Sequence, residues 1–342
     1  MSTSISPPDA GSPITLGQDL RLISLVGVAH MVSHFSQLLL PPLFPWLKDE
    51  FSTSYAELGF LMTVFFVVSC AVQALSGFFV DRMGPRPILF VGLALLGLAS
   101  MGYALSTTYW MLALCAALAG AGNGVFHPAD YTFLNRKVSA ARLGHAYSAH
   151  GISGSLGWAL APALVVGVTL AYSWRTALVV AGGLTFLVLA VLVWNRGLLE
   201  LPEASGDKQV SDSFMGFLRI PAVWMCFAFF FFSAISLGAV TAFAPEAARR
   251  LHNVPLTLVA VCLTFYMVSS AIGMVAGGFL AANPARCERV VASGYSLAAC
   301  MALLLALAAA SRAGHGGLAG LELEQRLIRG LLGDQRVGER GW

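Results

Sequence analysis

The sequence predicts an all-α polytopic membrane protein, and three observations lead to this fold class. Of its 342 residues, 57% are hydrophobic and 11% are charged, whereas a soluble domain carries roughly 25% charged residues. Apolar windows of about 20 residues, long enough to cross a bilayer as helices, recur from Arg21 to Ala310. The ten-residue segments of alternating polarity that are typical of membrane β-barrels are not found in the sequence. This composition excludes a soluble globule.

The apolar windows define nine membrane spans. In chain order they cover residues 21–46, 57–80, 87–106, 109–133, 143–171, 174–194, 217–247, 256–282 and 289–310. The six cysteines show no C-x-x-C pair, and five of them lie inside apolar runs, so they read as small buried hydrophobic residues.

The polar segments divide the chain into five parts. We expect a disordered cytoplasmic leader, a six-helix N-terminal lobe, a cytoplasmic linker, a partial C-terminal lobe of three spans and an aberrant polar tail. These parts correspond to residues 1–20, 21–194, 195–216, 217–310 and 311–342. The leader is rich in Ser, Pro, Gly and Asp and lacks the features of a cleaved signal peptide.

The distribution of basic residues predicts a cytoplasmic N-terminus. With that orientation, eleven Lys and Arg residues lie inside and four lie in outside loops, as the positive-inside rule requires. The remaining five arginines lie in the tail, which would then be external. Two interpretations of this tail stay open: an out-of-frame translation product of a truncated gene, or a genuine short form with an amphipathic segment near residues 318–332.

A weak internal repeat indicates two related halves. The residues from Gly77 to Arg82, at the end of span two, resemble those from Gly278 to Asn283, at the end of span eight, six spans later. Parallel repeats of six helices are typical of one class of secondary transporters, in which the substrate site lies between the halves.

The segment around this repeat carries a known signature. Gly77, Asp81, Arg82, Gly84 and Arg86 follow the pattern G-x-x-x-D-R-x-G-x-R and resemble the loop 2–3 motif of the major facilitator superfamily. Gly77 permits close helix approach, and Gly84 turns the loop. Within the superfamily the chain is similar to fosmidomycin-resistance-type exporters. The residues that support this similarity are His34-x-x-Gln37, the run from Gly122 to Asp130, and the run from His150 to Gly157.

The resemblance implies a bundle of two six-helix lobes, of which this chain holds about nine of twelve spans. It implies secondary transport, and for the exporters an exchange of a small molecule for protons. Two departures weaken the antiporter inference. Ala116 replaces an arginine often found in span four, and Ala161 replaces the second glycine of the antiporter element that ends at Pro162.

Polar residues inside the spans are the candidates for substrate binding and proton coupling, because ionisable groups in a bilayer need a reason to be there. They are His30, His34, Gln37, Asn123, His127 and His150. His30, His34 and Gln37 share one face of span one, which can line a cavity or hold interhelical hydrogen bonds. The rise along spans four and five places His127 and His150 in the same half of the membrane. Histidines with an ordinary pKa of about 6.5 change charge across a modest proton gradient.

Other polar and small residues have structural interpretations. We expect Asp130 to join Asp81 and Arg86 in an ion network at the base of span four, and Pro128 to kink that span. Gly151, Gly154 and Gly157, with Pro162, form an antiporter-like motif that favours tight helix packing.

The sequence therefore predicts a proton-coupled exporter of a drug-like or small anionic compound that works by alternating access. The alternatives are a transport-incompetent truncated form and a ligand-binding membrane receptor or sensor. An enzyme is disfavoured. We expect no cofactor, no metal, no nucleic acid and a monomer in the plasma (inner) membrane, with the lipid bilayer, the substrate and protons as partners. A zinc site at His30 and His34 is disfavoured because no nearby Cys or Glu completes it.

Overall fold

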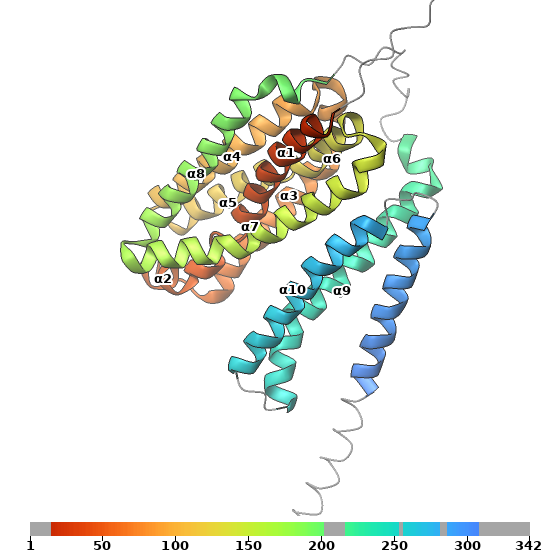
Figure 1. Cartoon of the computed structure of the whole chain (residues 1–342). Helices are drawn as coiled ribbons and strands as arrows, with labels where there is room; N and C mark the ends of the chain where they lie inside the picture. Colours follow the sequence, from red (N-terminus) through yellow and green to blue (C-terminus); the bar gives the residue numbers. More distant parts are fainter. Residues whose placement is uncertain (1–14, 202–215, 253–255, 281–285, 308–342) are drawn as a thin grey trace, which may run out of the picture. The chain divides into compact units, whose positions relative to one another are not determined.

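The structure is a computed structural model that describes residues 15–201, 216–252, 256–280 and 286–307. The chain divides into two compact units, Met1–Ala282 and Asn283–Trp342. The described residues form helices and turns and contain no strand, which confirms the predicted all-α class. Figure 1 shows the helices.

Eight α-helices and three short 3-10 helices build the six spans of the N-terminal lobe within the described residues. They are α1 (Leu16–Gln37), η1 (Pro41–Leu43), α2 (Phe44–Glu50), α3 (Tyr55–Met83), α4 (Pro85–Leu105), α5 (Tyr109–Asn123), α6 (Phe126–Lys137), η2 (Ala140–Arg142), α7 (Leu143–Ala171), α8 (Trp174–Trp194) and η3 (Arg196–Leu199).

The first span differs from its prediction at both ends. It starts earlier, because Thr15 caps α1 in a reciprocal capping box with Gln18. Residues 16–20 are therefore helical and do not belong to a disordered leader, while residues 1–14 lie outside the described residues. The span also breaks near Pro41, where the missing N–H of proline interrupts the helix before α2 begins.

The fourth span is interrupted at residues 124–125, about one turn before Pro128. Helix α5 ends at Asn123 and α6 begins at Phe126. Pro128 has no N–H to donate to the carbonyl of Gly124 four residues earlier, and this carbonyl instead accepts a hydrogen bond of 3.2 Å from Ser76 Oγ of α3. The predicted kink is thus a two-residue break between α5 and α6. The Gly124 carbonyl, which the helix does not use, accepts a hydrogen bond from the neighbouring helix α3.

Spans five and six agree with the predicted boundaries. Helix α7 covers Leu143–Ala171 without interruption at Pro162, and α8 begins at Trp174, after an N-cap at Ser173 whose side chain accepts from the Thr176 N–H.

Gly84 joins α3 to α4 with φ of 82°, a left-handed conformation that glycine adopts without strain. This confirms its predicted role as the residue that turns the loop.

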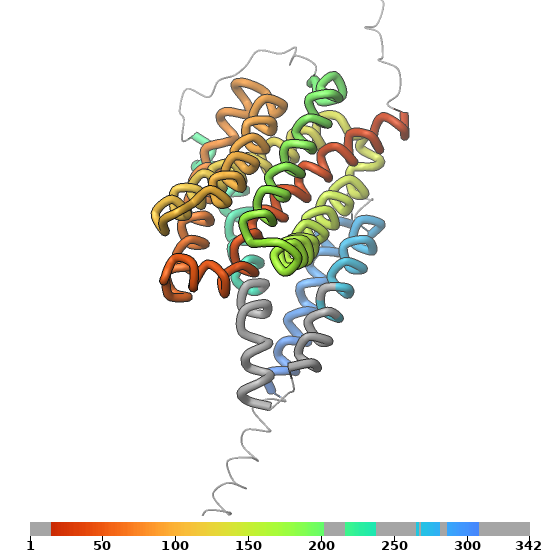
Figure 2. Tube along the Cα trace, turned by 90° about the vertical axis from the view of Figure 1, so that its left-hand side faces the viewer, coloured from red at the N-terminus to blue at the C-terminus, as the bar shows by residue number. Residues whose placement is uncertain are grey.

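Helix α1 lies at the centre of the lobe, where it contacts α4, α5, α6, α7 and α8. Figure 2 shows this dark red helix passing between its neighbours. The contact with α7 is close because of Gly157: a Cβ built there would lie 2.2 Å from the Met31 carbonyl oxygen. Helices α3 and α5 approach in the same way at Gly120, whose Cβ would lie 2.4 Å from the Phe65 carbonyl oxygen.

The outer surface of this lobe is apolar, as expected for helices that face lipid. Seven helices among the described residues are long and apolar enough to cross a membrane, and six of them belong to the spans above. Aromatic residues stand at helix ends, with Trp110 at the start of α5, Tyr172 after α7 and Trp194 at the end of α8 all strongly exposed. Such positions are typical of the membrane interface.

One end of the lobe is fastened by polar contacts. Asp19 of α1 is buried and accepts hydrogen bonds from Ser139 Oγ at 2.8 Å and from Arg142 Nε at 2.6 Å. At the same end Lys137 Nζ donates to the carbonyl oxygens of Leu198 at 2.6 Å and Glu200 at 2.8 Å. The segment after α8 is therefore part of the lobe, not of the linker predicted from residue 195.

The later spans are described in part. After η4 (Gly216–Arg219), α9 covers Pro221–His252 and α10 covers Leu256–Leu280. In the second unit, residues 286–307 form one helix, the seventh of those long enough to span a membrane. These helices match predicted spans seven to nine. The polar tail that was predicted from residue 311 lies outside the described residues.

Candidate functional site

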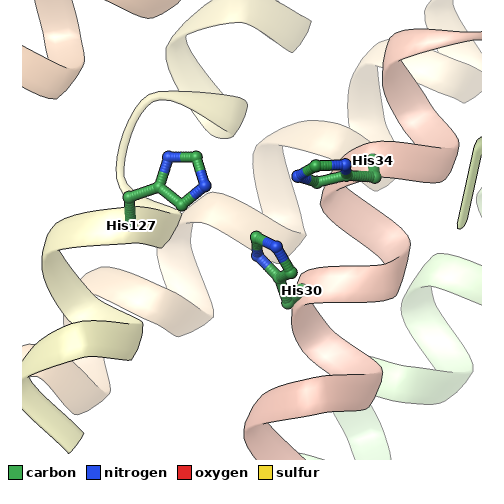
Figure 3. Close-up of side chains that lie close together, drawn as sticks. All are labelled: His30, His34 and His127. Carbon is green, nitrogen blue, oxygen red and sulfur yellow. The ribbon is translucent and has the colours of Figure 1, made fainter. Parts of the chain in front are cut away.

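Four histidines and one aspartate from three helices meet inside the N-terminal lobe, and we call them the histidine cluster. His30 and His34 lie one turn apart on α1, His127 and Asp130 lie on α6, and His150 lies on α7. Figure 3 shows the rings of His30, His34 and His127 turned toward a common space. All four histidines were candidates from the sequence, and the structure brings them together.

The rings of the cluster are in contact. Ring centroids lie 4.4 Å apart for His30 and His34, 3.5 Å for His30 and His150, and 5.2 Å for His30 and His127. The ring centroids of His127 and His150 lie 6.2 Å apart, so these two candidates lie at the same level of the helix bundle. His30 is the central ring of the cluster.

Asp130 supplies the carboxylate of the cluster. It is fully buried, and its Oδ2 lies 3.1 Å from His150 Nε2 and 3.2 Å from His30 Nδ1. We expected Asp130 to pair with Asp81 and Arg86, and this expectation was wrong. A buried carboxylate needs a charged or polar partner, and two imidazoles fill that role here.

Several polar atoms in the cluster have no hydrogen-bond partner among the described residues. These atoms are both ring nitrogens of His34, Nδ1 of His30 and Oδ1 of Asp130. Unpartnered polar groups are costly inside a protein. The ring of His34 also packs on Trp158, with centroids 4.5 Å apart. The cluster is therefore a polar site that keeps spare hydrogen-bonding capacity.

Gly154 of α7 leaves space beside these nitrogens. A Cβ built on Gly154 would lie 3.0 Å from His34 Nδ1 and 3.1 Å from His30 Nε2. Any other residue at this position would crowd both rings. The tight packing that the antiporter-like motif predicts is present at Gly157, whereas at Gly154 the missing side chain adjoins the site.

Gln37 and Asn123, the other two candidates, lie in a second polar group that we call the asparagine network. Asn123 Nδ2 donates to Ser33 Oγ at 2.7 Å, and Asn123 Oδ1 accepts from Ser69 Oγ at 2.8 Å and from Gln37 Nε2 at 3.5 Å. Trp158 Nε1 donates to Gln37 Oε1 at 2.9 Å. These bonds connect α1, α3, α5 and α7, so Asn123 acts as an interhelical link with no free amide group.

Gln73 of α3 is a site residue that sequence reasoning missed. Its Oε1 lies 2.9 Å from His127 Nδ1, and the side chain is exposed, so the cluster borders the surface of the lobe. The signal was available in the sequence, since Gln73 is a polar residue inside an apolar span. Asp19 was also missed, because it was assigned to the leader.

The loop motif after α3 performs a different task from the one expected. Arg86 Nη1 contacts Glu200 Oε1 at 3.2 Å and the Arg196 carbonyl oxygen at 3.4 Å. Asp81 and Arg82 end α3 and are exposed. Within the described residues nothing lies within 4 Å of a Cβ built on Gly77. Gly77 therefore makes no close helix contact in this part of the chain, and the prediction of one was wrong here.

Among the described residues, the cluster contains two sets of three side chains that could each hold a metal ion. One set is His30, His34 and His127, and the other is His30, Asp130 and His150. The arrangement as a whole can bind a polar or charged species inside a membrane bundle, which is the usual role of intramembrane ionisable groups.

The comparisons with known proteins identify the family. The family model of the Major Facilitator Superfamily matches residues 26–321. The chain belongs to this superfamily, which confirms the resemblance read from the loop motif.

Two relatives show what the chain is similar to. The fosmidomycin resistance protein of Escherichia coli is 26% identical over 172 residues, which are 50% of this chain and 40% of the relative. The membrane sensor protein UhpC of Salmonella typhimurium is 30% identical over 157 residues, which are 46% of this chain and 35% of the sensor. The matched region thus covers less than half the length of each of these relatives.

A solved structure supports the fold. The proton:xylose symporter XylE, bound to 6-bromo-6-deoxy-D-glucose, aligns with a TM-score of 0.59 at 14% sequence identity, over 78% of this chain and 69% of XylE. At this identity the similarity shows the fold alone, a bundle of membrane-spanning helices.

Proposed function

We propose that this chain is a secondary transporter that exports a small drug-like or anionic compound by alternating access, in exchange for protons. The observation that carries the proposal is the histidine cluster. Both ring nitrogens of His34, a member of the cluster, have no hydrogen-bond partner among the described residues. The cluster itself lies inside a bundle of membrane-spanning helices. A bilayer tolerates such groups only where they serve a function.

The position of the cluster supports a substrate site. His34 and His127 are half-buried, and Gln73 beside His127 is exposed, so a ligand can reach the imidazoles from the surface of the lobe. Trp158 packs on His34 and adds an aromatic wall. Imidazole donors beside an aromatic ring suit a compound with an anionic head group and a small organic body.

The direction of transport and the exchanged ion come from the resemblance to fosmidomycin-resistance-type exporters and from the relative of that name. We place the protein as a monomer in the plasma (inner) membrane with a cytoplasmic N-terminus, on the basis of its basic loop residues. The proposed roles need no cofactor and no catalytic residue.

Efflux from everted membrane vesicles tests the proposal. Vesicles that contain the protein should accumulate labelled fosmidomycin when the vesicle interior is made more acidic than the external medium. His34→Leu, which keeps side-chain volume but removes both ring nitrogens, should reduce this accumulation to the level of vesicles without the protein. His145→Leu, at an exposed histidine of α7, is the matched control and should keep full activity.

Two results would contradict the proposal. Transport that persists in the His34→Leu variant would exclude the histidine cluster as the site. Absence of transport for fosmidomycin and also for a panel of small anions, with correctly folded protein in the vesicles, would exclude an exporter of this class.

A ligand-binding sensor is the second candidate, and the similarity to the membrane sensor protein UhpC favours it. A sensor binds its ligand without moving it. Trp158 in contact with His34 is a natural reporter, so a ligand should change tryptophan fluorescence in the protein but not in its Trp158→Phe variant. A fluorescence change without flux identifies a sensor, and a change with flux identifies a transporter.

A further inference from the structure

We propose that His30, His34 and His127 form a binding site for one divalent transition-metal ion of the zinc and cobalt class. The proposal goes beyond transport, since metal binding by these side chains does not depend on the direction of transport or on the exchanged ion. Neutral imidazole is a preferred ligand of these ions.

The three side chains are placed to share one ion. Each offers a ring nitrogen, and these three atoms lie within 4.8 Å of one another. His30 and His34 are four residues apart on α1, the spacing that puts two side chains on one face of a helix, and His127 reaches them from α6 (Figure 3). From the sequence only His30 and His34, on one helix, were considered as zinc ligands. The third, His127, is the second residue of α6, directly after the break that follows α5.

Neighbouring groups prepare two of the rings for metal binding. The Gln73 oxygen lies 2.9 Å from His127 Nδ1. An amide oxygen can only accept, so Nδ1 carries the proton and Nε2 keeps its lone pair. Asp130 Oδ2 lies 3.2 Å from His30 Nδ1 as a charged neighbour without a hydrogen bond, so the carboxylate occupies that side of the ring and Nε2, beside Gly154, is the nitrogen that faces the site. A histidine ligand held by a carboxylate or amide through its other nitrogen is the usual arrangement at metal sites.

The third ring and the adjoining space complete the site. Neither nitrogen of His34 has a hydrogen-bond partner among the described residues, so either can turn toward an ion. Gly154 leaves the space beside His34 Nδ1 and His30 Nε2 that a Cβ would fill. Three protein ligands leave one position of a tetrahedral ion open to water or to an anion.

The alternative set of His30, Asp130 and His150 is less suited to an ion. Its carboxylate oxygen Oδ2 already contacts both imidazoles, at 3.2 and 3.1 Å. Metal binding there would require His30 and His150 to release this oxygen. We therefore assign Asp130 as a positioning residue behind His30.

Cobalt titration of the full chain in detergent tests the site. The protein should carry an affinity tag without histidine, and the chain's three histidines outside the cluster, His145, His252 and His315, should be replaced by Ala. This background variant should bind one equivalent of Co²⁺, give the visible ligand-field absorption of a tetrahedral nitrogen site, and lose it when Zn²⁺ is added in equal amount.

Substitutions in this background locate the ion. His34→Leu and His127→Leu should each abolish the absorption while helix content and thermal stability are retained. Gly154→Ala should also abolish it, whereas Gly167→Ala, on the same helix with open space around it, should not. Gln73→Ala should keep one-to-one binding but weaken it about 10–100-fold, the usual cost of losing a partner of a histidine ligand.

Three outcomes would overturn the proposal. They are the absence of stoichiometric Co²⁺ binding to the folded background variant, binding that survives both His34→Leu and His127→Leu, and binding that requires His150 but not His127. The last outcome would place the ion in the alternative set. None of these measurements involves transport, so failure of the metal site and failure of the proposed export are distinguishable.

Discussion

The histidine cluster and the asparagine network are two polar regions in the same membrane lobe, and their hydrogen bonding differs. In the asparagine network the amide groups of Asn123 and Gln37 are used in bonds between helices. In the histidine cluster both nitrogens of His34 and one oxygen of Asp130 have no partner among the described residues.

This difference in hydrogen bonding distinguishes polar residues that hold helices together from polar residues that remain available to a ligand. Polar residues in membrane helices either join helices or serve a ligand, and composition alone does not distinguish the two. From its saturated bonding we infer that Asn123 joins helices, and from its unused nitrogens we propose that His34 serves a ligand. Three substitutions test this assignment through the free energy of unfolding, from the largest expected effect to the smallest.

Gly157→Ala should have the largest effect, because it disturbs the frame that holds both polar regions. The added methyl would lie 2.2 Å from the Met31 carbonyl oxygen, so α1 and α7 must separate. We expect a loss of about 3 kcal/mol, the upper end of the usual cost of overpacking. The measurement is denaturant unfolding in detergent micelles, followed by helix content.

Gly167→Ala is the matched control for this variant. It lies on the same helix and has nothing within 4 Å of its Cβ direction. It should be neutral or slightly stabilising, since alanine favours helix more than glycine does. Equal losses for the two variants would show that the closeness of α1 and α7 is not what stabilises the lobe.

Asn123→Ala should have the second largest effect. It removes the partner of Ser33, Ser69 and Gln37 at once. Hydrogen bonds between membrane helices contribute about 0.6 kcal/mol each on average, so a loss of about 2 kcal/mol is expected in the same unfolding assay. Asn195→Ala, at a half-buried asparagine after α8 whose Nδ2 donates to the Val191 carbonyl oxygen at 2.8 Å, removes only this one local hydrogen bond and should cost about 1 kcal/mol or less.

His34→Leu should have the smallest effect on stability. The nitrogens that it removes bond to no described residue, and replacing an unpartnered polar group by an apolar one of similar size is close to neutral. We expect unfolding within about 0.5 kcal/mol of the original protein, together with loss of transport. A destabilisation as large as that of Asn123→Ala would show that His34 is structural, and the contrast between the two regions would fail.

Hydropathy predicted the spans well where capping residues and loops mark the ends clearly. The boundaries of α7 and α8 agree with the predicted residues 143–171 and 174–194, because the break between them contains Ser173, which caps α8. The first span was misplaced because the capping box of Thr15 and Gln18 lies in a segment whose composition resembles a leader.

The site could be predicted in its members but not in its pairings. Distance along a helix follows from the rise of 1.5 Å per residue, which is why His127 and His150 were expected at the same level of the bundle, and their rings do lie 6.2 Å apart. Which face each helix turns to its neighbours depends on packing, for example at Gly157, and hydropathy does not contain this rotation. For this reason Asp130 was assigned to Asp81 and Arg86, and a third metal ligand was not foreseen.

The bonds of Lys137 to the carbonyl oxygens of Leu198 and Glu200 determine where the polypeptide can be divided. For expression of the lobe as a separate fragment, a cut after Trp194 would remove both acceptors and leave a half-buried ammonium group without them. A cut after Leu201 would keep them and would also retain Glu200 for Arg86. The natural place to split this protein in two therefore lies several residues beyond the last turn of its sixth span.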